Sequence, residues 1–331
     1  MRLAILDDYQ GISQTIVDWQ QIPGLSVVSY RDHIHDECEL INRLRGFDVV
    51  MRIRERTAFP RSLLEQLPQL KLILATGMRN ARSIDLPACR QLGIKVSTTN
   101  AMHQTTVEVT WALILNLFRR IPQEVQSVAA GAWQSGVGVG LAGRTLGILG
   151  LGNMGKPVAS IGRLFGMDVI AWSPNLTQQR CDPHGVRCVT KQALFGRSDV
   201  VTVHMPASER TVGIVSQTEI NSMKPGAYFV NTARAELVDE QALIEALQTR
   251  KIAGAGLDVF SVEPLPQDHP FRWLPNVIAT PHIGFVTEEN MREFFQTSLT
   301  NLNAFMSGNP VNVISDEHPL LPDSQLARQG H

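Results

Sequence analysis

Short apolar runs alternate with amphipathic segments along most of the chain. Each apolar run is rich in β-branched residues and ends on turn residues, which predicts a strand. The predicted strands span residues 2–6, 25–30, 47–53, 70–76 and 94–100, then 145–150, 168–173, 200–205, 227–233, 252–259 and 276–280. Because helical patterns lie between them, the sequence predicts parallel sheets that are covered by helices on both faces.

Two long helical patterns interrupt this alternation. One runs from His103 to Trp133, and the other runs from Thr287 to Gly308. We interpret them as the two connections between domains. The first domain is therefore predicted to be discontinuous, with residues 1–101 and 287–331, and the second is predicted to span residues 102–286. The expected fold class is α/β, with two doubly wound parallel-sheet domains.

Composition excludes several classes of protein. The 331 residues are 44% hydrophobic and 18% charged, as in soluble globular proteins, and the length favours two domains. A net charge of −1 without basic clusters argues against nucleic acid, and no apolar run is long enough to cross a membrane. Cys38, Cys89, Cys181 and Cys188 have no metal-ligand spacing, so we expect reduced thiols in a cytoplasmic protein without a metal site.

A glycine motif follows the predicted strand at 145–150. Gly150, Gly152 and Gly155 form GxGxxG, with Asn153 and Met154 between the last two glycines. The first glycine permits a tight turn, the second allows a pyrophosphate to approach the backbone, and the third allows the next helix to pack closely. A helical run follows, and its N-terminus favours a phosphate. The motif in this setting predicts a dinucleotide site.

The tip of the next strand carries Ser173 where a ribose-binding acid is usual. An acid would repel a 2′-phosphate, whereas Ser173 can donate to one, and Arg180 lies a few residues further on. Asp168 has nearly the expected spacing, but it opens the strand, and ribose binds at the carboxyl end. We therefore favour NADP; the alternative is NAD held through Ser173, Asn175 or water. Pro174 completes this predicted part of the site.

Three later segments place chemically active side chains after predicted strands. Arg234 follows one strand, Asp258 ends the next with Glu263 in its loop, and His282 follows the last. The carboxyl ends of parallel strands meet at one edge, so these side chains are expected to converge there. Histidine is suited to move the proton that accompanies hydride transfer to a carbonyl, a carboxylate can hold its ring, and arginine can bind a carboxylate.

With these residues the sequence resembles the D-isomer-specific 2-hydroxyacid dehydrogenases, which include glyoxylate/hydroxypyruvate reductases and phosphoglycerate dehydrogenases. The matching blocks are GLGNMG, VHMPASERTVGIV, MKPGAYFVNTARAELVDEQAL, GAGLDVFSVEPLP and TPHIG, in family order. The resemblance covers the chain from the first strand to about residue 314. It implies a Rossmann cofactor domain inserted in a flavodoxin-like substrate domain. It also implies NAD(P)-dependent interconversion of a small 2-keto acid and its D-2-hydroxy acid.

The resemblance implies a role for each matching residue. Arg234 would bind the carbonyl and carboxylate of the substrate, and His282 would be the general acid or base, paired with Glu263. Asp258 would hold the nicotinamide carboxamide. The other implied cofactor contacts are Thr106, His204, Met205, Pro206, Thr211, Thr232 and Ala233, and the implied substrate contacts are Arg54, Gly77, Met78 and Arg79. The loop ATGMRNARSID is longer than the usual family form, so the identity of the keto acid is left open.

Two other functions stay open at this point. Some relatives of this fold sense nucleotides as interaction proteins, and such a protein would bind the cofactor without turnover. A phosphite dehydrogenase is the second alternative, whereas Glu263 argues against formate because formate-oxidising relatives usually carry glutamine there. The resemblance further implies a homodimer, which the apolar face of residues 103–133 fits.

Overall fold

A computed structural model describes residues 1–77 and 83–314 of the chain. Its contacts divide the chain into two compact units. The first unit comprises Met1–Met102 and the segment that begins at Thr287, and the second comprises His103–Val286. The chain crosses between the units at Met102–His103 and again at Val286–Thr287.

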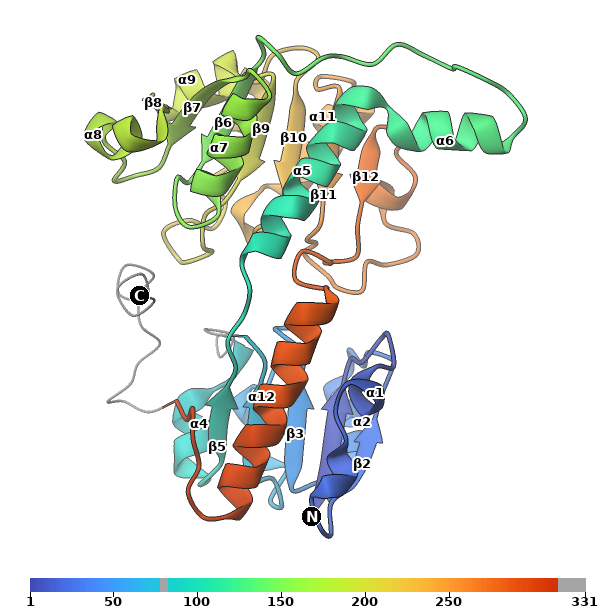
Figure 1. Cartoon of the computed structure of the whole chain (residues 1–331), viewed down its shortest axis with the longest axis vertical. Helices are drawn as coiled ribbons and strands as arrows, with labels where there is room; N and C mark the ends of the chain where they lie inside the picture. Colours follow the sequence, from blue (N-terminus) through green and yellow to red (C-terminus); the bar gives the residue numbers. More distant parts are fainter. Residues whose placement is uncertain (78–82, 315–331) are drawn as a thin grey trace. The chain divides into compact units, whose positions relative to one another are not determined.

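The first unit contains a five-stranded parallel sheet in the order β2-β1-β3-β4-β5 (Figure 1). Its strands are β1 (Arg2–Leu6), β2 (Ser26–Ser29), β3 (Val49–Arg52), β4 (Leu72–Ala75) and β5 (Lys95–Thr98). This order is that of flavodoxin-like folds, as predicted. The direction of winding reverses between β1 and β3, so a crevice for ligands is expected beyond their carboxyl ends.

Helices cover this sheet and enclose an apolar core. They are α1 (Ser13–Ile16), η1 (Trp19–Gln21), α2 (Glu37–Leu44), α3 (Arg61–Glu65), α4 (Leu86–Gln91) and α12 (Glu288–Met306). The long helix α12 returns from the far end of the sequence and packs against β4 and β5. The buried Asn301 side chain donates a 2.9 Å hydrogen bond to the Thr98 carbonyl, which ties α12 to the end of β5.

The second unit contains a seven-stranded parallel sheet in the order β12-β11-β10-β9-β6-β7-β8. Its strands are β6 (Thr145–Leu149), β7 (Asp168–Trp172), β8 (Arg187–Cys188), β9 (Val200–Val203), β10 (Tyr228–Asn231), β11 (Gly254–Leu257) and β12 (Val277–Ala279). The first strand of the unit, β6, is an inner strand of the sheet, and the winding reverses between β6 and β9. This is the Rossmann order with one added strand, so the predicted fold class is confirmed.

Helices lie on both faces of the second sheet. They are α5 (Gln104–Arg119), α6 (Ile121–Ala129), α7 (Gly155–Leu164), α8 (Gln178–Cys181), η3 (Asp182–His184), α9 (Lys191–Arg197), α10 (Gln217–Ser222), η4 (Ala235–Leu237), α11 (Glu240–Gln248) and η5 (Pro270–Arg272). Neighbouring residues of one strand belong to different core clusters: Phe229 packs on one face of β10, and Val230 packs on the other. The inner strands are therefore buried on both faces.

The helical pattern from His103 to Trp133 forms two helices, α5 and α6. Arg120 adopts a left-handed backbone conformation with φ of 56° and separates α5 from α6. Pro122 explains the break, because a proline ring clashes with the carbonyl four residues earlier and has no N–H to donate. That carbonyl belongs to Phe118, and it accepts a 2.7 Å hydrogen bond from the Val139 amide instead.

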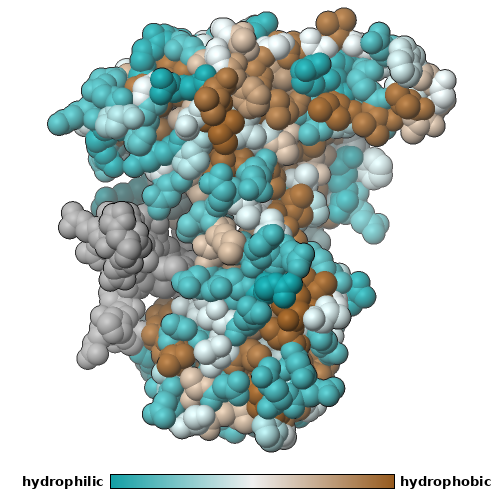
Figure 2. All heavy atoms as spheres, in the orientation of Figure 1, coloured by the Kyte–Doolittle hydropathy of each residue, from teal (hydrophilic) through white to brown (hydrophobic). Residues whose placement is uncertain are grey.

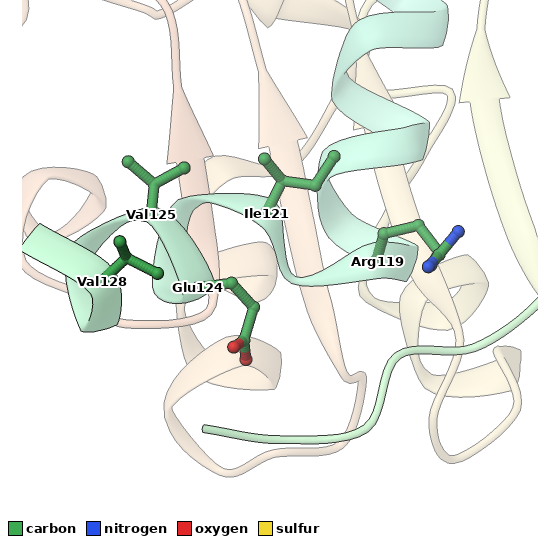
Figure 3. A pocket seen from close by; sticks show the side chains of 5 residues that line it. All are labelled: Arg119, Ile121, Glu124, Val125 and Val128. Atoms are coloured by element: carbon green, nitrogen blue, oxygen red, sulfur yellow. The ribbon is translucent and has the colours of Figure 1, made fainter. Parts of the chain in front are cut away.

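Helix α6 projects from the layers of the second unit and exposes an apolar face (Figures 1 and 2). The structure describes this helix in full, and none of its residues is buried. Ile121, Val125 and Val128 follow helical spacing and are 42%, 61% and 57% exposed. Together with Arg119 and Glu124 they line a shallow hollow (Figure 3).

The three glycines between β6 and α7 differ in how much space surrounds them. Gly150 has φ of 101°, and a Cβ built on it would lie 2.8 Å from the His204 carbonyl oxygen. A Cβ on Gly155 would lie 2.1 Å from the Gly150 carbonyl oxygen. A Cβ on Gly152 would meet no atom within 4 Å. The turn is therefore closed at its two ends and open in its middle.

These contacts predict opposite results for two alanine variants of the turn. Gly155→Ala should destabilise the protein by about 1–3 kcal/mol, because the new methyl group meets backbone that must shift. Gly152→Ala should change the unfolding free energy by less than about 0.5 kcal/mol, since its methyl group enters open space. Denaturant unfolding measures both values, and equal stability of the two variants would contradict the close packing described here.

Candidate active site

The glycine turn of the second unit lies where the winding of the sheet reverses. Strands β6 and β9 are neighbours there, and the His204 amide donates a 2.8 Å hydrogen bond to the Leu149 carbonyl. Gly150, Met205 and His204 are in close contact at this point. The structure thus brings together the glycine turn and the 204–206 loop, two segments that the sequence assigned to one cofactor site.

The side chains of the 204–211 loop brace the loop itself. The His204 ring lies 2.9 Å from the Thr202 hydroxyl oxygen, and burial lowers the pKa of His204 to about 3. Its ring is therefore neutral near pH 7 and does not act as a proton donor there. The Thr211 hydroxyl donates a 2.8 Å hydrogen bond to the Pro206 carbonyl.

A basic hollow lies beside the carboxyl end of β7. The lining residues are Trp172, Ser173, Pro174, Leu176, Cys188, Val189, Thr190, Lys191, Ala193 and Arg197. These described residues include two cations and no carboxylate. Arg180 lies against the same loop, with a 3.1 Å hydrogen bond to the Asn175 carbonyl. Asp168 is at the opposite end of β7, where it pairs with Arg187, so it has no place at the ribose end.

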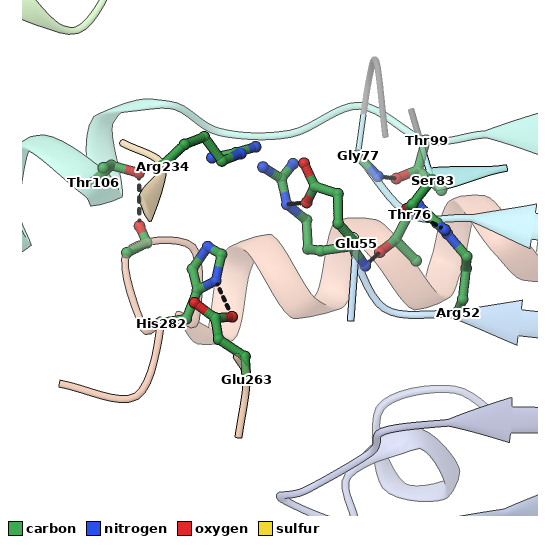
Figure 4. A network of polar contacts seen from close by, with 12 residues as sticks. Arg52, Glu55, Thr76, Gly77, Ser83, Thr99, Thr106, Arg234, Glu263 and His282 are labelled. Atoms are coloured by element: carbon green, nitrogen blue, oxygen red, sulfur yellow. Dashed lines mark hydrogen bonds and ion pairs between the residues drawn. The ribbon is translucent and has the colours of Figure 1, made fainter. Parts of the chain in front are cut away.

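Three neighbouring strands of the second sheet carry the predicted catalytic residues. Arg234 follows β10, Asp258 follows β11 and His282 follows β12. Glu263, in the loop after β11, lies with Oε2 2.7 Å from Nδ1 of His282 (Figure 4). Its other oxygen accepts a 2.9 Å hydrogen bond from the Phe260 amide, which fixes the carboxylate. The structure therefore forms the histidine–glutamate pair from residues that lie far apart in the sequence.

The backbone that carries His282 is held by a buried aspartate. His282 has φ of 52°, a left-handed conformation that is uncommon for a residue other than glycine. Asp258 Oδ1 accepts hydrogen bonds from the Thr280 hydroxyl at 2.6 Å and the Ile283 amide at 2.9 Å. Its Oδ2 accepts from the Gly284 amide at 2.8 Å. Burial raises the pKa of Asp258, and the three hydrogen bonds oppose that rise.

The sequence prediction assigned Asp258 to the nicotinamide and did not identify its loop partners. Two more threonines contribute to the same loop: the Thr105 hydroxyl donates to the Gly284 carbonyl at 2.7 Å, and the Thr106 hydroxyl donates to it at 3.0 Å (Figure 4). Thr106 was predicted as a cofactor contact, whereas Thr105 was missed. The polar pair TT at the start of α5 was the available signal.

Arg234 lies in a turn that a second buried polar residue holds. Asn231 donates a 2.9 Å hydrogen bond to the Arg234 carbonyl and accepts a 3.0 Å hydrogen bond from the Ala233 amide. The Thr232 hydroxyl lies 2.8 Å from that of Thr110, on α5. Asn231 and Thr110 are not among the residues predicted for the site, although Asn231 is a polar residue that ends an apolar strand.

Two of the predicted substrate contacts, Arg54 and Gly77, are described in the first unit. Arg54 follows β3, and its amide donates a 2.9 Å hydrogen bond to the Thr76 hydroxyl. Gly77 follows β4, and its amide donates a 2.8 Å hydrogen bond to the Thr99 hydroxyl (Figure 4). Met78 and Arg79 lie outside the described residues. The described substrate residues thus occupy the carboxyl edge of the first sheet.

Chemically, the second unit presents a proton-transfer pair and a glycine turn at the carboxyl ends of strands of the same sheet. His282 and Glu263 are partly exposed, so the histidine is accessible to a reacting oxygen. In residues 1–77 and 83–314, no cluster of histidine, cysteine and acidic side chains has the arrangement of a metal site. Within the same ranges, no helix combines the length and the apolar character that a membrane span requires.

Comparison with known proteins extends these observations. The sequence model named D-isomer specific 2-hydroxyacid dehydrogenase, NAD binding domain, matches residues 111–284. A hydroxypyruvate reductase of Blautia hydrogenotrophica is 31% identical over 332 residues, a match that covers 95% of this chain and 100% of the relative. A D-3-phosphoglycerate dehydrogenase of Archaeoglobus fulgidus is 34% identical over 281 residues. That match covers 84% of this chain and 53% of the relative, so it spans about half of that protein.

Solved structures lead to the same family. A phosphoglycerate oxidoreductase of Vibrio cholerae is 37% identical and has a TM-score of 0.88, with 93% of this chain and 99% of that chain covered. The sequence model, the relatives and the structural neighbour agree on the family. The chain belongs to the D-isomer-specific 2-hydroxyacid dehydrogenase family, and it is an oxidoreductase.

Proposed function

We propose that the protein reduces a small 2-keto acid to its D-2-hydroxy acid with a nicotinamide cofactor, and catalyses the reverse oxidation. The 2.7 Å contact between His282 and Glu263 is the observation that carries this proposal. Relatives named hydroxypyruvate reductase and D-3-phosphoglycerate dehydrogenase support the substrate class.

The glycine turn fits a dinucleotide. The open space around Gly152 leaves room for a pyrophosphate against the backbone, and the ten-residue helix α7 begins at Gly155. Ser173, Pro174 and Asn175 would hold the ribose side, and the 204–206 loop would flank it. The bound nicotinamide supplies or accepts the hydride. The protein's own side chains carry out all other steps.

Each catalytic side chain has a distinct task in this proposal. His282 donates a proton to the carbonyl oxygen during reduction and removes it during oxidation. Glu263 keeps the ring oriented and stabilises the protonated imidazole. Arg234 binds the carbonyl and carboxylate oxygens of the substrate through its planar guanidinium. Asp258 holds the loop that positions His282.

Substitution of the histidine tests the proposal. His282→Ala should lower kcat for glyoxylate or hydroxypyruvate by about 10²–10⁴-fold, because the reacting oxygen loses its proton donor. Cofactor affinity, measured by fluorescence titration, should stay within about twofold. His269→Ala is a matched control, since His269 also lies beside a glutamate, 3.3 Å from Glu240, and keeps activity in this proposal.

The same assay separates the alternative functions. Cofactor binding by the wild-type protein without turnover of any 2-keto acid would indicate a nucleotide-sensing protein. Oxidation of phosphite, with no turnover of keto acids, would indicate the phosphite reaction. Undiminished keto-acid reduction by His282→Ala would refute the assigned acid.

We further propose that the cofactor is NADP. The hollow beside Ser173 is lined by Lys191 and Arg197 and by no carboxylate among its described residues, so no lining residue repels a 2′-phosphate. Lys191 is also paired with Glu219 at 3.0 Å, which leaves Arg197 and the nearby Arg180 as further cations.

Introducing an acid at the strand end should reverse the preference. Ser173→Asp should raise the KM for NADPH at least about tenfold, because like charges placed together cost more than about 1.4 kcal/mol. The KM for NADH should change little or fall. Ser173→Ala is the control, since it removes the hydroxyl without adding charge. Steady-state kinetics measure the ratio of the KM for NADPH to the KM for NADH. A wild-type preference for NADH would contradict the proposal.

We also propose that the protein is a homodimer formed through α6. An apolar helix face that projects from its unit is expected to be covered, and three aliphatic side chains line the hollow in Figure 3 together with Arg119 and Glu124. A second copy presents the same face, so the contact can close by twofold symmetry.

A charge in the centre of this face should separate the subunits. Val125→Glu should convert a dimer to a monomer in sedimentation experiments, because burying an unpaired carboxylate is costly. Gln126→Glu adds the same charge to α6 one residue away from the aliphatic row, and it should stay dimeric. A monomeric wild-type protein, or a dimeric Val125→Glu variant, would overturn this assignment.

A further inference from the structure

Two strained residues follow neighbouring strands at the reversal point of the first sheet. Asp7 comes directly after β1, and Arg54 follows β3; these strands pair in parallel, with Leu6 opposite Arg52. Asp7 has φ of 57° and Arg54 has φ of 56°. Left-handed residues other than glycine persist only where their surroundings hold them, and they concentrate at functional sites.

Asp7 is almost completely buried, and its polar atoms contact the segment after β3. Its Oδ2 accepts a 2.6 Å hydrogen bond from the Thr57 hydroxyl, and its carbonyl accepts a 2.6 Å hydrogen bond from the Arg56 guanidinium. Its Oδ1 lies 2.8 Å from Nδ1 of His33. Asp7 is only 1% exposed, so it acts through these neighbours and does not contact a ligand itself.

The other end of Thr57 is held by a buried cation. The guanidinium of Arg52, which is fully buried, donates a 2.8 Å hydrogen bond to the Thr57 carbonyl. The same nitrogen donates a 2.8 Å hydrogen bond to the Ser83 hydroxyl (Figure 4). The Thr57 hydroxyl thus donates to the carboxylate of Asp7, and the Thr57 carbonyl accepts from the guanidinium of Arg52.

We propose that Asp7, Thr57 and Arg52 form a clamp that positions Arg54 for the anionic end of the substrate. The clamp fixes the end of the 53–57 segment, and the hydrogen bond to Thr76 fixes its start. Arg54 then keeps its left-handed backbone before substrate arrives, and less conformational entropy is lost on binding. This inference rests on the proposed function, because it takes the 53–57 segment to contact the keto acid.

Asp8 shows that burial alone does not define the clamp. It is also fully buried, but its carboxylate accepts hydrogen bonds from the amides of Ile12 and Ser13 and from the Ser29 hydroxyl. Ile12 and Ser13 lie in the segment after β1, and Ser29 is the last residue of β2. Ser29→Ala therefore removes a hydroxyl from a buried aspartate, as Thr57→Val does, without touching the 53–57 segment.

This matched pair of variants tests the proposal. Both should lower the melting temperature by a similar amount. Only Thr57→Val should raise the KM for glyoxylate or hydroxypyruvate, by about tenfold, with kcat and the cofactor KM within about threefold. Only Thr57→Val should speed hydrogen exchange of the amides at 53–57. Thr57→Ser, which restores the hydroxyl, should return the KM for the keto acid and the exchange rate at 53–57 toward those of the wild type.

The KM for the keto acid and the hydrogen exchange at 53–57 can each contradict the proposal independently. Equal KM values for Thr57→Val and Ser29→Ala, or unchanged exchange at 53–57, would overturn the clamp as a positioning device. Faster exchange with an unchanged KM would overturn its role toward the substrate. If the wild-type protein reduces no keto acid, the proposed function fails, and with it the role toward that substrate. The exchange comparison then still decides whether Thr57 holds the segment.

Discussion

Burial of the inner strands on both faces is the constraint on which the rest of the structure depends. A covered sheet leaves no room for an unpaired polar group, since one unsatisfied buried polar atom costs about 1–3 kcal/mol. Polar chemistry therefore gathers where the strands end. In the second unit Arg234, Asp258 and His282 follow three neighbouring strands, and in the first unit Asp7 and Arg54 follow two.

Both units have the same arrangement at these strand ends, namely a buried aspartate that accepts hydrogen bonds from a neighbouring loop. Asp258 and Asp7 are each 1% exposed and come directly after a strand, and each accepts hydrogen bonds from a loop with a left-handed residue. The residue is His282 in one unit and Arg54 in the other. Such a conformation costs about 1–3 kcal/mol unless its surroundings impose it. A buried carboxylate is itself costly without donors, so aspartate and loop stabilise each other.

The parts of this arrangement that the sequence predicts are those encoded locally. Strand positions follow from apolar runs, and the glycine turn follows from a short motif between a strand and a helix. The break at Arg120 was missed because the apolar period continues through it, although Pro122 was visible. The partners of Asp258 include backbone amides, which leave no trace in a sequence. Whether Asp7 or its neighbour holds the 53–57 segment depends on pairing between distant strands.

The two aspartate networks also show how the units can vary separately. Every described partner of Asp258 lies within His103–Val286, and every described partner of Asp7 lies within Met1–Met102. Substitutions couple energetically when they share partners, and the hydrogen bonds given above for Asp258 and for Asp7 end on different residues. In the proposed function one network orients the proton-transfer histidine and the other orients a substrate contact. Substrate preference can then change in the first unit while the chemistry of the second is kept, which fits a family whose members are named for different acids.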